Sequence, residues 1–443
     1  MKKLALIVTV LFLSVNRASA APFSDNWEFS GSLALTWRGL GPAFHAAEVE
    51  VENSLFLPGT YLSVDGPVLS GIPFRLEMTT DVQGQPRISQ ILAAHKSWRH
   101  FNFAMGKFLI PYGAYNRRRY RPDQYLTITH PLFYADPRNL DAVIRLNLPH
   151  PLFSAGYTDI GAEISFFPDA ESIWAPYQAQ FYAVNGLAES REQGRPFPSS
   201  QVLVIAPLSP NGVDMDWNHQ NTDFRENNDT KSVGGRLEFR LGDFSAPLAL
   251  PAIRSLDVGF SAMGGRYDID DTLKYGIYGA DLFLQWGALS FNSEFNYSSL
   301  DFRSPLITTI IASTGTTLVS ADLPADKDYV RGYSFQAAMP LPLPEFLWGL
   351  GGKLTGVLGY DYMQRYGPEL TLRNGSVLVN GQEFFQINVF TGKGRVHRRI
   401  KKHTAALNYR IRDNFSMKWE LTSWELEGHL DLYQWAVSSV FNF

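Results

Sequence analysis

The chain ends with the stretch Leu430–Phe443, LDLYQWAVSSVFNF, in which apolar and polar residues largely alternate. One side of this alternation is apolar and mostly aromatic: Tyr433, Trp435, Val437, Phe441 and Phe443. The other side is mainly polar: Gln434, Ser438 and Asn442. A period of two residues predicts a β-strand with one apolar face. Because no residue follows Phe443 to cover that face, we expect lipid rather than water beside it.

This terminal strand resembles the C-terminal strand of bacterial outer-membrane β-barrels, whose terminal aromatic residue is read by the assembly machinery. The resemblance implies an all-β fold, a transmembrane antiparallel β-barrel. The leader and the composition of the chain favour the same fold class.

Residues 1–20 have the three parts of a secretory signal peptide. Lys2 and Lys3 form a positive start, residues 4–15 are nearly all apolar, and residues 18–20 (Ala-Ser-Ala) form a small-residue cleavage site. About 12 apolar residues fall short of the ~20 that a membrane-spanning helix needs. We therefore predict cleavage after Ala20 and one transmembrane β-barrel domain over residues 21–443, located in the bacterial outer membrane.

The composition excludes several classes of function. The formal net charge of −4 becomes −7 once the three leader cations Lys2, Lys3 and Arg17 are removed, and a mildly acidic chain argues against a nucleic-acid partner. The chain has no cysteine, which excludes disulfides, thiolate catalysis and iron–sulfur ligation. Its 31 Phe, 20 Tyr and 10 Trp are typical of a barrel with aromatic girdles at both membrane interfaces.

Alternating segments recur along the whole chain. In residues 27–38, aromatic residues occupy both ends of the apolar face and aliphatic residues its middle, which is the order expected across a membrane. We expect about 16 strands of this kind, most of them near the ~10 residues that span a membrane, whereas strands of a soluble sandwich usually have ~5–6. They lie near residues 27–38, 47–52, 74–81, 87–98, 101–110, 159–166, 177–185, 233–240, 256–261, 278–286, 289–297, 333–336, 353–362, 405–412, 415–422 and 430–443.

The parity of the strand count decides where the connections lie. A further candidate strand, residues 140–147, would make the count odd, whereas bacterial barrels have an even number of strands. This candidate is short and lies between Pro137 and Pro149, so we reject it. The long connections are then all extracellular, and short turns such as 286–288 and 413–414 face the periplasm. The expected long loops are residues 111–154, 186–230, 300–328 and 363–398.

The third extracellular loop, residues 111–154, is rich in prolines and aromatic residues, which predicts an ordered, compact loop. Five cations precede its first acid, Asp123: Lys107, Arg117, Arg118, Arg119 and Arg121. In a narrowed pore, guanidinium groups attract anions and pair with phosphate or carboxylate through two hydrogen bonds. The alternative is that these residues lie on the outer surface of the loop or pair with lumen carboxylates such as Glu77 and Asp81.

Three motifs carry a resemblance to a known family: GKFLIPYG (Gly106–Gly113), YQAQFYAVNG (Tyr177–Gly186) and the last strand ending in Phe443. They resemble the phosphate-selective porin O/P-like group of Gram-negative outer-membrane porins. The resemblance implies a constriction loop folded into a water-filled lumen, with the basic residues of the loop at the constriction, and a homotrimer. The loop is rich in arginine rather than lysine, so the phosphate-binding lysines of the family have no residue-by-residue match here.

The polar faces of the strands predict a lumen wall of mixed charge. Charged residues expected on this wall include Arg75, Glu77, Arg236, Arg240, Arg410 and Lys418. Opposed rows of charge orient polar solutes in a pore, and the same residues can equally pair with one another and rigidify the wall. A second basic cluster lies at the outer end of the fourteenth strand. There Arg399 and Lys401 continue the lipid face, which predicts contact with the phosphates of lipopolysaccharide, the alternative being a solvated loop edge.

Candidate catalytic and metal sites are weak. The sequence has no HExxH, GxSxG or P-loop pattern, and we expect no enzyme activity, no metal site and no cofactor. The favoured function is a porin that lets small hydrophilic solutes, with a preference for anions, diffuse passively through the lumen. One alternative is a barrel that sheathes a multihaem cytochrome in an electron-transfer conduit, which needs an open lumen. Another is a barrel enzyme, for which no Ser–His or Asp–His pair is evident.

Overall fold

The structure is a computed structural model. It describes residues 27–40, 54–69, 72–80, 86–98, 100–118, 121, 123–134, 156–167, 177–187, 230–242, 253–267, 271–302, 305–306, 321–322, 326–344, 351–379, 382–427 and 431–443. The predicted signal peptide and the expected strand at 47–52 lie outside these residues, and so do the cations of the leader.

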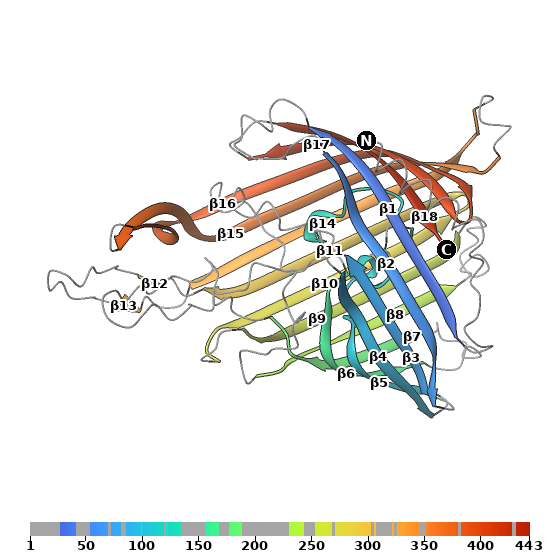
Figure 1. The fold of residues 1–443 in the computed structure, drawn as a ribbon, viewed down its shortest axis with the longest axis horizontal. Helices are drawn as coiled ribbons and strands as arrows, with labels where there is room; N and C mark the ends of the chain where they lie inside the picture. Colours follow the sequence, from blue (N-terminus) through green and yellow to red (C-terminus); the bar gives the residue numbers. More distant parts are fainter. Residues whose placement is uncertain are drawn as a thin grey trace.

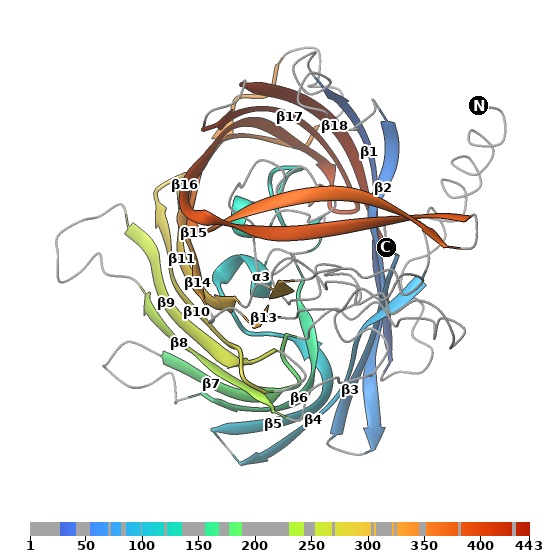
Figure 2. The same cartoon turned by 90° about the vertical axis from the view of Figure 1, so that its left-hand side faces the viewer.

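The described strands form a closed barrel of sixteen antiparallel strands, which confirms the expected fold class (Figures 1 and 2). In the first half of the chain, the strands are β1 (Glu28–Leu40), β2 (Ser54–Leu69), β3 (Ile72–Thr80), β4 (Pro86–Trp98), β5 (Phe101–Leu109), β6 (Thr158–Phe166), β7 (Tyr177–Val184) and β8 (Ser232–Gly242). In the second half, they are β9 (Ile253–Arg266), β10 (Lys274–Trp286), β11 (Leu289–Phe302), β14 (Asp326–Leu341), β15 (Lys353–Val379), β16 (Gln382–Arg412), β17 (Phe415–Leu426) and β18 (Leu432–Asn442). A separate short pair, β12 (Pro305–Leu306) and β13 (Ala321–Asp322), lies between β11 and β14 in the chain.

The ring closes between the first and the last strand. β1 and β18 pair antiparallel, with Ser32 opposite Asn442, so the start of β1 and the end of β18 lie at the same end of the barrel, as the parity argument requires. β5 pairs directly with β6, with Phe101 opposite Phe166. The rejected strand candidate, residues 140–147, lies outside the described part of the chain.

The prediction of a loop over residues 363–398 is wrong. β15 and β16 continue far beyond the other strands as one long hairpin, with Val379 opposite Gln382 (Figure 1). The cross-strand ladder pairs the backbone N–H and C=O groups that face each other in this extension, and the outward groups are left to water, so the hairpin does not depend on an apolar membrane face. A second difference is that β2 begins only at Ser54, further along the chain than the expected second strand. The turns at 287–288 and 413–414 are confirmed.

The outward face of the barrel carries the apolar side chains of the alternating pattern. Phe181, Leu358 and Leu421 are 58%, 67% and 56% exposed. Their polar neighbours along the strands, such as Gln180 and Glu420, are buried on the inner side. Apolar side chains exposed all around a barrel are stable only where an apolar medium covers them.

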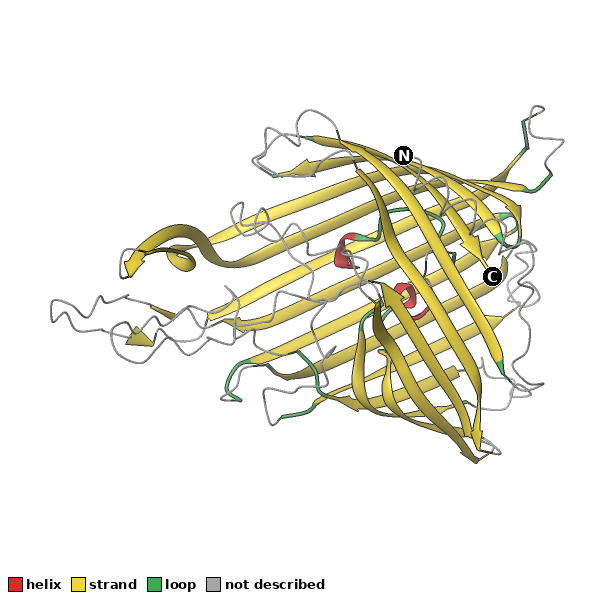
Figure 3. Ribbon diagram, viewed as in Figure 1, coloured by secondary structure: helices red, strands yellow, loops and turns green. Residues whose placement is uncertain are grey.

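The third loop folds into the barrel, as the resemblance implies. Its helix α3 (Ala114–Arg118) and its 3-10 turn η1 (Leu132–Tyr134) lie inside the ring of strands (Figures 2 and 3). Loop residues pack with inward side chains of the wall in one apolar core that includes Ile110, Tyr112, Tyr115, Tyr125, Leu132, Tyr134, Tyr182, Met263, Ile277, Met363 and Ile400. No helix in the described part of the chain is long and apolar enough to cross a membrane.

Candidate functional site: a lumen crossed by the third loop

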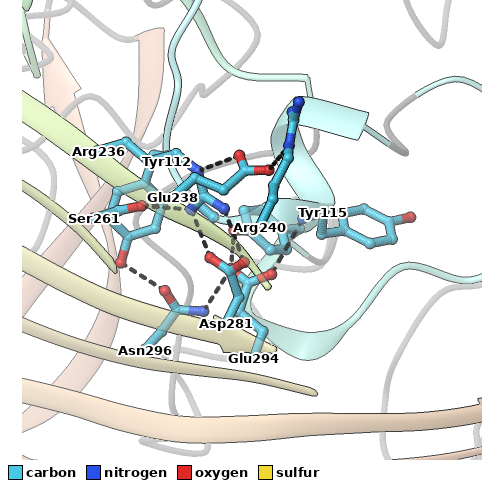
Figure 4. A network of polar contacts seen from close by, with 11 residues as sticks. Tyr112, Tyr115, Arg236, Glu238, Arg240, Ser261, Asp281, Glu294 and Asn296 are labelled. Atoms are coloured by element: carbon cyan, nitrogen blue, oxygen red, sulfur yellow. Dashed lines mark hydrogen bonds and ion pairs between the residues drawn. The ribbon is translucent and has the colours of Figure 1, made fainter. Parts of the chain in front are cut away.

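Glu294 on β11 is the anchor for the first part of the third loop (Figure 4). Its carboxylate accepts hydrogen bonds from the backbone N–H of Tyr115 (3.3 Å), from the hydroxyl of Tyr134, and from Asn296 Nδ2 (3.2 Å). Asn296 in turn accepts a hydrogen bond from the hydroxyl of Tyr112 (2.6 Å). A buried carboxylate is costly unless several donors compensate its lost hydration. The loop supplies two of these three donors, Tyr115 and Tyr134, so docking the loop and burying Glu294 stabilise each other.

Gly113, the last residue of the GKFLIPYG motif, allows the loop to approach this wall closely. Its φ is +63°, in the left-handed region that favours glycine. A Cβ at this position would overlap the Glu294 carboxylate and the Tyr134 hydroxyl. The backbone N–H of Gly113 also donates to Ser261 Oγ on β9 (3.1 Å). The motif glycine is therefore explained by the docking of the loop.

Arg236 on β8 is bound by other side chains of the barrel wall, next to Glu294 (Figure 4). Its guanidinium donates to both oxygens of Asp281 (2.5 and 2.8 Å) and to Ser261 Oγ (2.9 Å), and it lies 3.6 Å from Glu238. Its side chain is 1% exposed. Arg240 donates to Glu238 (3.1 Å) but remains 48% exposed. Of these two predicted wall residues, Arg236 is a buried structural cation and Arg240 presents a charge to the solvent.

Lys418 and Glu420 on β17 hold the middle of the loop. Lys418 Nζ donates to the backbone C=O of Tyr125 (2.5 Å) and of Thr127 (3.3 Å), and it lies 4.3 Å from the centre of the Tyr125 ring. Glu420 accepts a hydrogen bond from the backbone N–H of Thr129 (3.1 Å). A cation and a carboxylate on one strand thus satisfy carbonyl and N–H groups of the same loop segment.

Lys402 on β16 extends this clamp to the next residue of the loop. Its Nζ donates to the backbone C=O of His130 (2.5 Å) and forms an ion pair with Asp361 of β15 (2.9 Å). The Lys402 side chain is 1% exposed. Strands β16 and β17 therefore hold residues 125–130 of the loop, and Asp361 of β15 holds Lys402 in place.

Arg121 fastens the loop to the far side of the barrel. Its guanidinium forms a charged hydrogen bond with Glu77 of β3, which also accepts hydrogen bonds from Ser89 and Gln90 of β4. β3 and β11 are separated by seven strands in either direction around the ring. The contacts of Glu294 and Arg121 thus show that the loop crosses the lumen from one wall to the opposite one.

Tyrosines at the centre of the loop remain neutral. Tyr115 and Tyr134 stack with ring centroids 5.2 Å apart. Burial, with the negative charge of Glu294 as a further cause, raises the pKa of both Tyr112 and Tyr134 well above the usual value. Both hydroxyls therefore donate rather than ionise, which the hydrogen bonds to Asn296 and Glu294 require.

The other residues predicted for the constriction fall into three groups. Lys107 is buried, with Nζ donating to the C=O of Ile88 (3.0 Å). Arg117 and Arg118 contribute their backbone to α3, and Arg119 lies outside the described residues. Arg121 pairs with Glu77, which is the alternative to a cation that contacts solutes at the constriction. The assignment of the five residues to a solute-contacting constriction remains a prediction.

The remaining predicted wall residues lie toward the end of the barrel at which β1 begins and β18 ends. Arg75 forms an ion pair with Asp65 of β2 (2.6 Å) and is 44% exposed. Arg410 is exposed and lies opposite Lys353 of β15 in the strand register. Neither Arg410 nor Lys353 forms an ion pair with a carboxylate among the described residues. Like charges placed directly opposite each other destabilise a sheet, so this basic pair is a candidate for contact with anions.

The residues that position the loop could not be identified from the sequence. Glu294 and Glu420 lie on the predicted polar faces, but nothing in their local sequence indicates that they bind a loop about 180 to 290 residues away in the chain, as the separations of their contacts show. Lys402 follows Arg399 and Lys401 in the same basic stretch of the chain, but nothing in its local sequence indicates that it contacts the loop. Among the described residues, no group of three or more His, Cys, Asp or Glu residues could hold a metal ion.

Arg399 and Lys401, predicted to contact lipopolysaccharide, lie on the outward face of β16. Arg399 forms an ion pair with Glu427 (2.7 Å), and Lys401 forms one with Glu425 (2.6 Å). The hydrogen bond from Arg399 holds the pKa of Glu427 below its usual range. Exposed ion pairs of this kind contribute little to stability, so both cations remain accessible to a competing anion.

The chain matches no family model and no curated protein. Solved structures similar to it include the anion-selective porin from Comamonas acidovorans (TM-score 0.50, 8% identity, 94% of this chain and 99% of that chain covered). Others are the outer membrane channel DcaP of Acinetobacter baumannii (TM-score 0.47, 9% identity, 96% and 99% covered) and a trimer form of OmpT from Vibrio cholerae (TM-score 0.48, 8% identity, 94% and 99% covered). At 8% identity the likeness to the Comamonas porin shows the fold alone, a closed β-barrel of the outer-membrane type.

Proposed function

We propose that this protein is an outer-membrane porin through which small hydrophilic solutes diffuse passively. The observation that carries this proposal is the third loop, which crosses the lumen from Glu294 to Arg121 and is held by buried charged side chains at both ends. A wide barrel without such a loop would leave a large aqueous channel. A rigid loop inside it narrows the lumen to a size that selects solutes.

The proposed preference is for anions. Arg240, Lys353 and Arg410 are exposed cations expected on the inner side of the wall, and the Arg117–Arg119 segment adds three more in the sequence of the loop. Removing one unit charge about 4 Å from a permeating ion in water changes its energy by ~1 kcal/mol, which is about fivefold in permeability. The porin from Comamonas acidovorans, described as anion-selective, has the same fold.

The test compares two sets of variants by reversal potential in planar bilayers under a KCl gradient. One set is Arg117→Ala, Arg118→Ala and Arg119→Ala together, and the other is Lys353→Gln with Arg410→Gln. Loss of anion preference in the first set assigns the selectivity to the loop, and loss in the second set assigns it to the periplasmic mouth. Lys274→Gln, an exposed cation at the outer end of β10, is the matched control. Unchanged selectivity in both sets contradicts the anion preference, and absence of conductance in the wild type contradicts the porin.

The sheath of an electron-transfer conduit is not favoured, because a sheath needs an open lumen and the third loop crosses it. We keep the phosphate-selective O/P-like group, the homotrimer and the location in the outer membrane as parts of the proposal. The motifs GKFLIPYG and YQAQFYAVNG support the group, and the exposed apolar face supports the membrane.

A further inference from the structure

The outward face of strands β14 to β17 is ordered in bands along the barrel. The register places Arg331, Gln364 and Arg399 in one row across β14, β15 and β16. The next row toward the periplasm contains Tyr333, Tyr362, Lys401 and Glu425, and the one after it contains Phe335, Tyr360, His403 and Ser423. Two further rows contain Ala337, Leu358, Ala405 and Leu421, and Met339, Gly356, Leu407 and Trp419. Charge, aromatic rings and aliphatic side chains thus follow one another toward the middle of the wall.

The cations of the first two rows, Arg331, Arg399 and Lys401, together with Arg395 further out on β16, form what we call the rim patch. Arg331 is exposed, and its guanidinium donates to the neutral side chain of Gln364 (3.2 and 3.1 Å). Arg395 lies over the ring of Tyr366, 4.8 Å from its centre. Only two carboxylates, Glu425 and Glu427, form ion pairs with the patch among the described residues. Arg331, Arg399 and Lys401 carry three permanent positive charges against the two carboxylates, so these described residues keep a net positive charge.

The second band is aromatic. Tyr333 stacks on Tyr362 (5.2 Å between centroids) and packs beside Tyr360 (5.9 Å), which contacts His403 (5.0 Å). Tyrosines gather at the membrane–water interface because one end of the ring is apolar and the other is polar. This band therefore places the headgroup level of the membrane just below the rim patch.

The third band is an apolar groove. It is lined by the small residues Ala337, Gly356 and Ala405 and by the larger side chains of Met339, Leu358, Leu407 and Trp435. Ala405 follows Arg399 by six residues on the same strand, and a strand rises ~3.4 Å per residue. The groove consequently lies about 20 Å below the rim patch, within reach of an acyl chain from a headgroup bound there.

We propose that this face of the barrel binds one phosphorylated, acylated glycolipid of the outer leaflet, as in lipopolysaccharide. Arg331 and Arg399 hold its phosphate, since guanidinium groups pair with phosphate through two parallel hydrogen bonds. The groove over Ala405 holds an acyl chain. This inference rests on the outer-membrane location in the proposed function, but it does not depend on conductance or on the solute.

The test is native mass spectrometry of the purified barrel in detergent, titrated with bisphosphorylated lipid A and, separately, with the same lipid after dephosphorylation. We expect one phosphorylated lipid to bind the wild type, and the Arg331→Gln/Arg399→Gln variant to bind it about tenfold more weakly, the loss of roughly one charge-assisted contact. Lys274→Gln removes an outer-end cation from β10 and is expected to bind as the wild type does.

Two single variants test the proposed lipid site, one expected to tighten lipid binding and the other to weaken it. Glu427→Gln frees Arg399 from its ion pair and is expected to tighten binding severalfold. Ala405→Phe fills the groove and is expected to weaken binding of the acylated lipid. Equal binding of both lipids by the wild type, or unchanged binding by the double variant, overturns the proposal. Bilayer conductance of the same samples separates this result from the porin proposal, because all the substituted residues face away from the lumen.

Discussion

Gly113 has a left-handed backbone conformation and lies directly against the wall of the barrel. The docking of the loop depends on both features. We predict that Gly113→Ala displaces the first part of the loop, because φ near +63° costs an L-residue ~1–2 kcal/mol and the new Cβ overlaps Glu294 and Tyr134. The expected result is a larger and noisier single-channel current from a barrel that still assembles.

Gly287 provides the matched control for this prediction. It also has a positive φ, +58°, but a Cβ there would meet nothing within 4 Å. Gly287→Ala therefore carries the backbone strain without touching the loop, and we expect its current to equal that of the wild type. Equal currents from the Gly113 and Gly287 variants would show that Gly113 does not position the loop.

The hydroxyl of Tyr134 makes the docking of the loop weaker at alkaline pH. Burial and the charge of Glu294 raise the pKa of Tyr134 well above the usual value, whereas a solvated tyrosine ionises near pH ~10. The undocked loop loses this proton first, so the contribution of Tyr134 to docking is complete below about pH 10 and declines as the pH rises further. We predict that Tyr134→Phe removes part of the change in conductance above about pH 10. Tyr433→Phe on the exposed outer face is the control, and identical pH profiles for the two variants would contradict the prediction.

At the scale of elements, β17 carries the clamp on the middle of the loop. We predict that Lys418→Met releases residues 125–127, because hydrogen bonds from a charged donor contribute ~1.5–3 kcal/mol each. Single-channel current should rise, and the thermal unfolding of the barrel should change little, since the wall ladder is intact. Thr422→Val on the same strand is the control, because the Thr422 hydroxyl donates to the backbone C=O of Gln434 within the wall (3.5 Å) and not to the loop. A wild-type current from the Lys418 variant would show that this clamp is dispensable.

The strands and their faces could be predicted from the sequence because a period of two residues is a local property. The long hairpin of β15 and β16 was missed, although Asn380-Gly381 between its strands is a strong hairpin signal. The clamp could not be predicted, since Lys418 contacts carbonyls of residues almost 300 positions earlier in the chain. Such contacts depend on the closed barrel, which brings distant segments together.

At the scale of the whole molecule, one seam closes the barrel. Gly31 and Phe443 exchange two backbone hydrogen bonds (2.8 and 3.1 Å), and the Phe443 ring packs 6.0 Å from that of Phe29. An open seam would expose two strand edges to lipid, where no water satisfies their polar groups. The terminal residue therefore supports the closure of the ring.

We predict that Phe443→Ala lowers the yield of assembled barrel and its unfolding temperature, because the variant keeps the backbone hydrogen bonds but loses an aromatic contact of ~0.5–1.5 kcal/mol. Heat-dependent mobility on gels measures both quantities. Phe239→Ala is the control, since Phe239 packs against Phe260 (6.3 Å) on the outward face far from the seam. The two contacts are of the same kind, so a larger effect at Phe443 measures the importance of closure itself. Equal effects would mean that the terminal aromatic residue stabilises the barrel only as any other outward ring does.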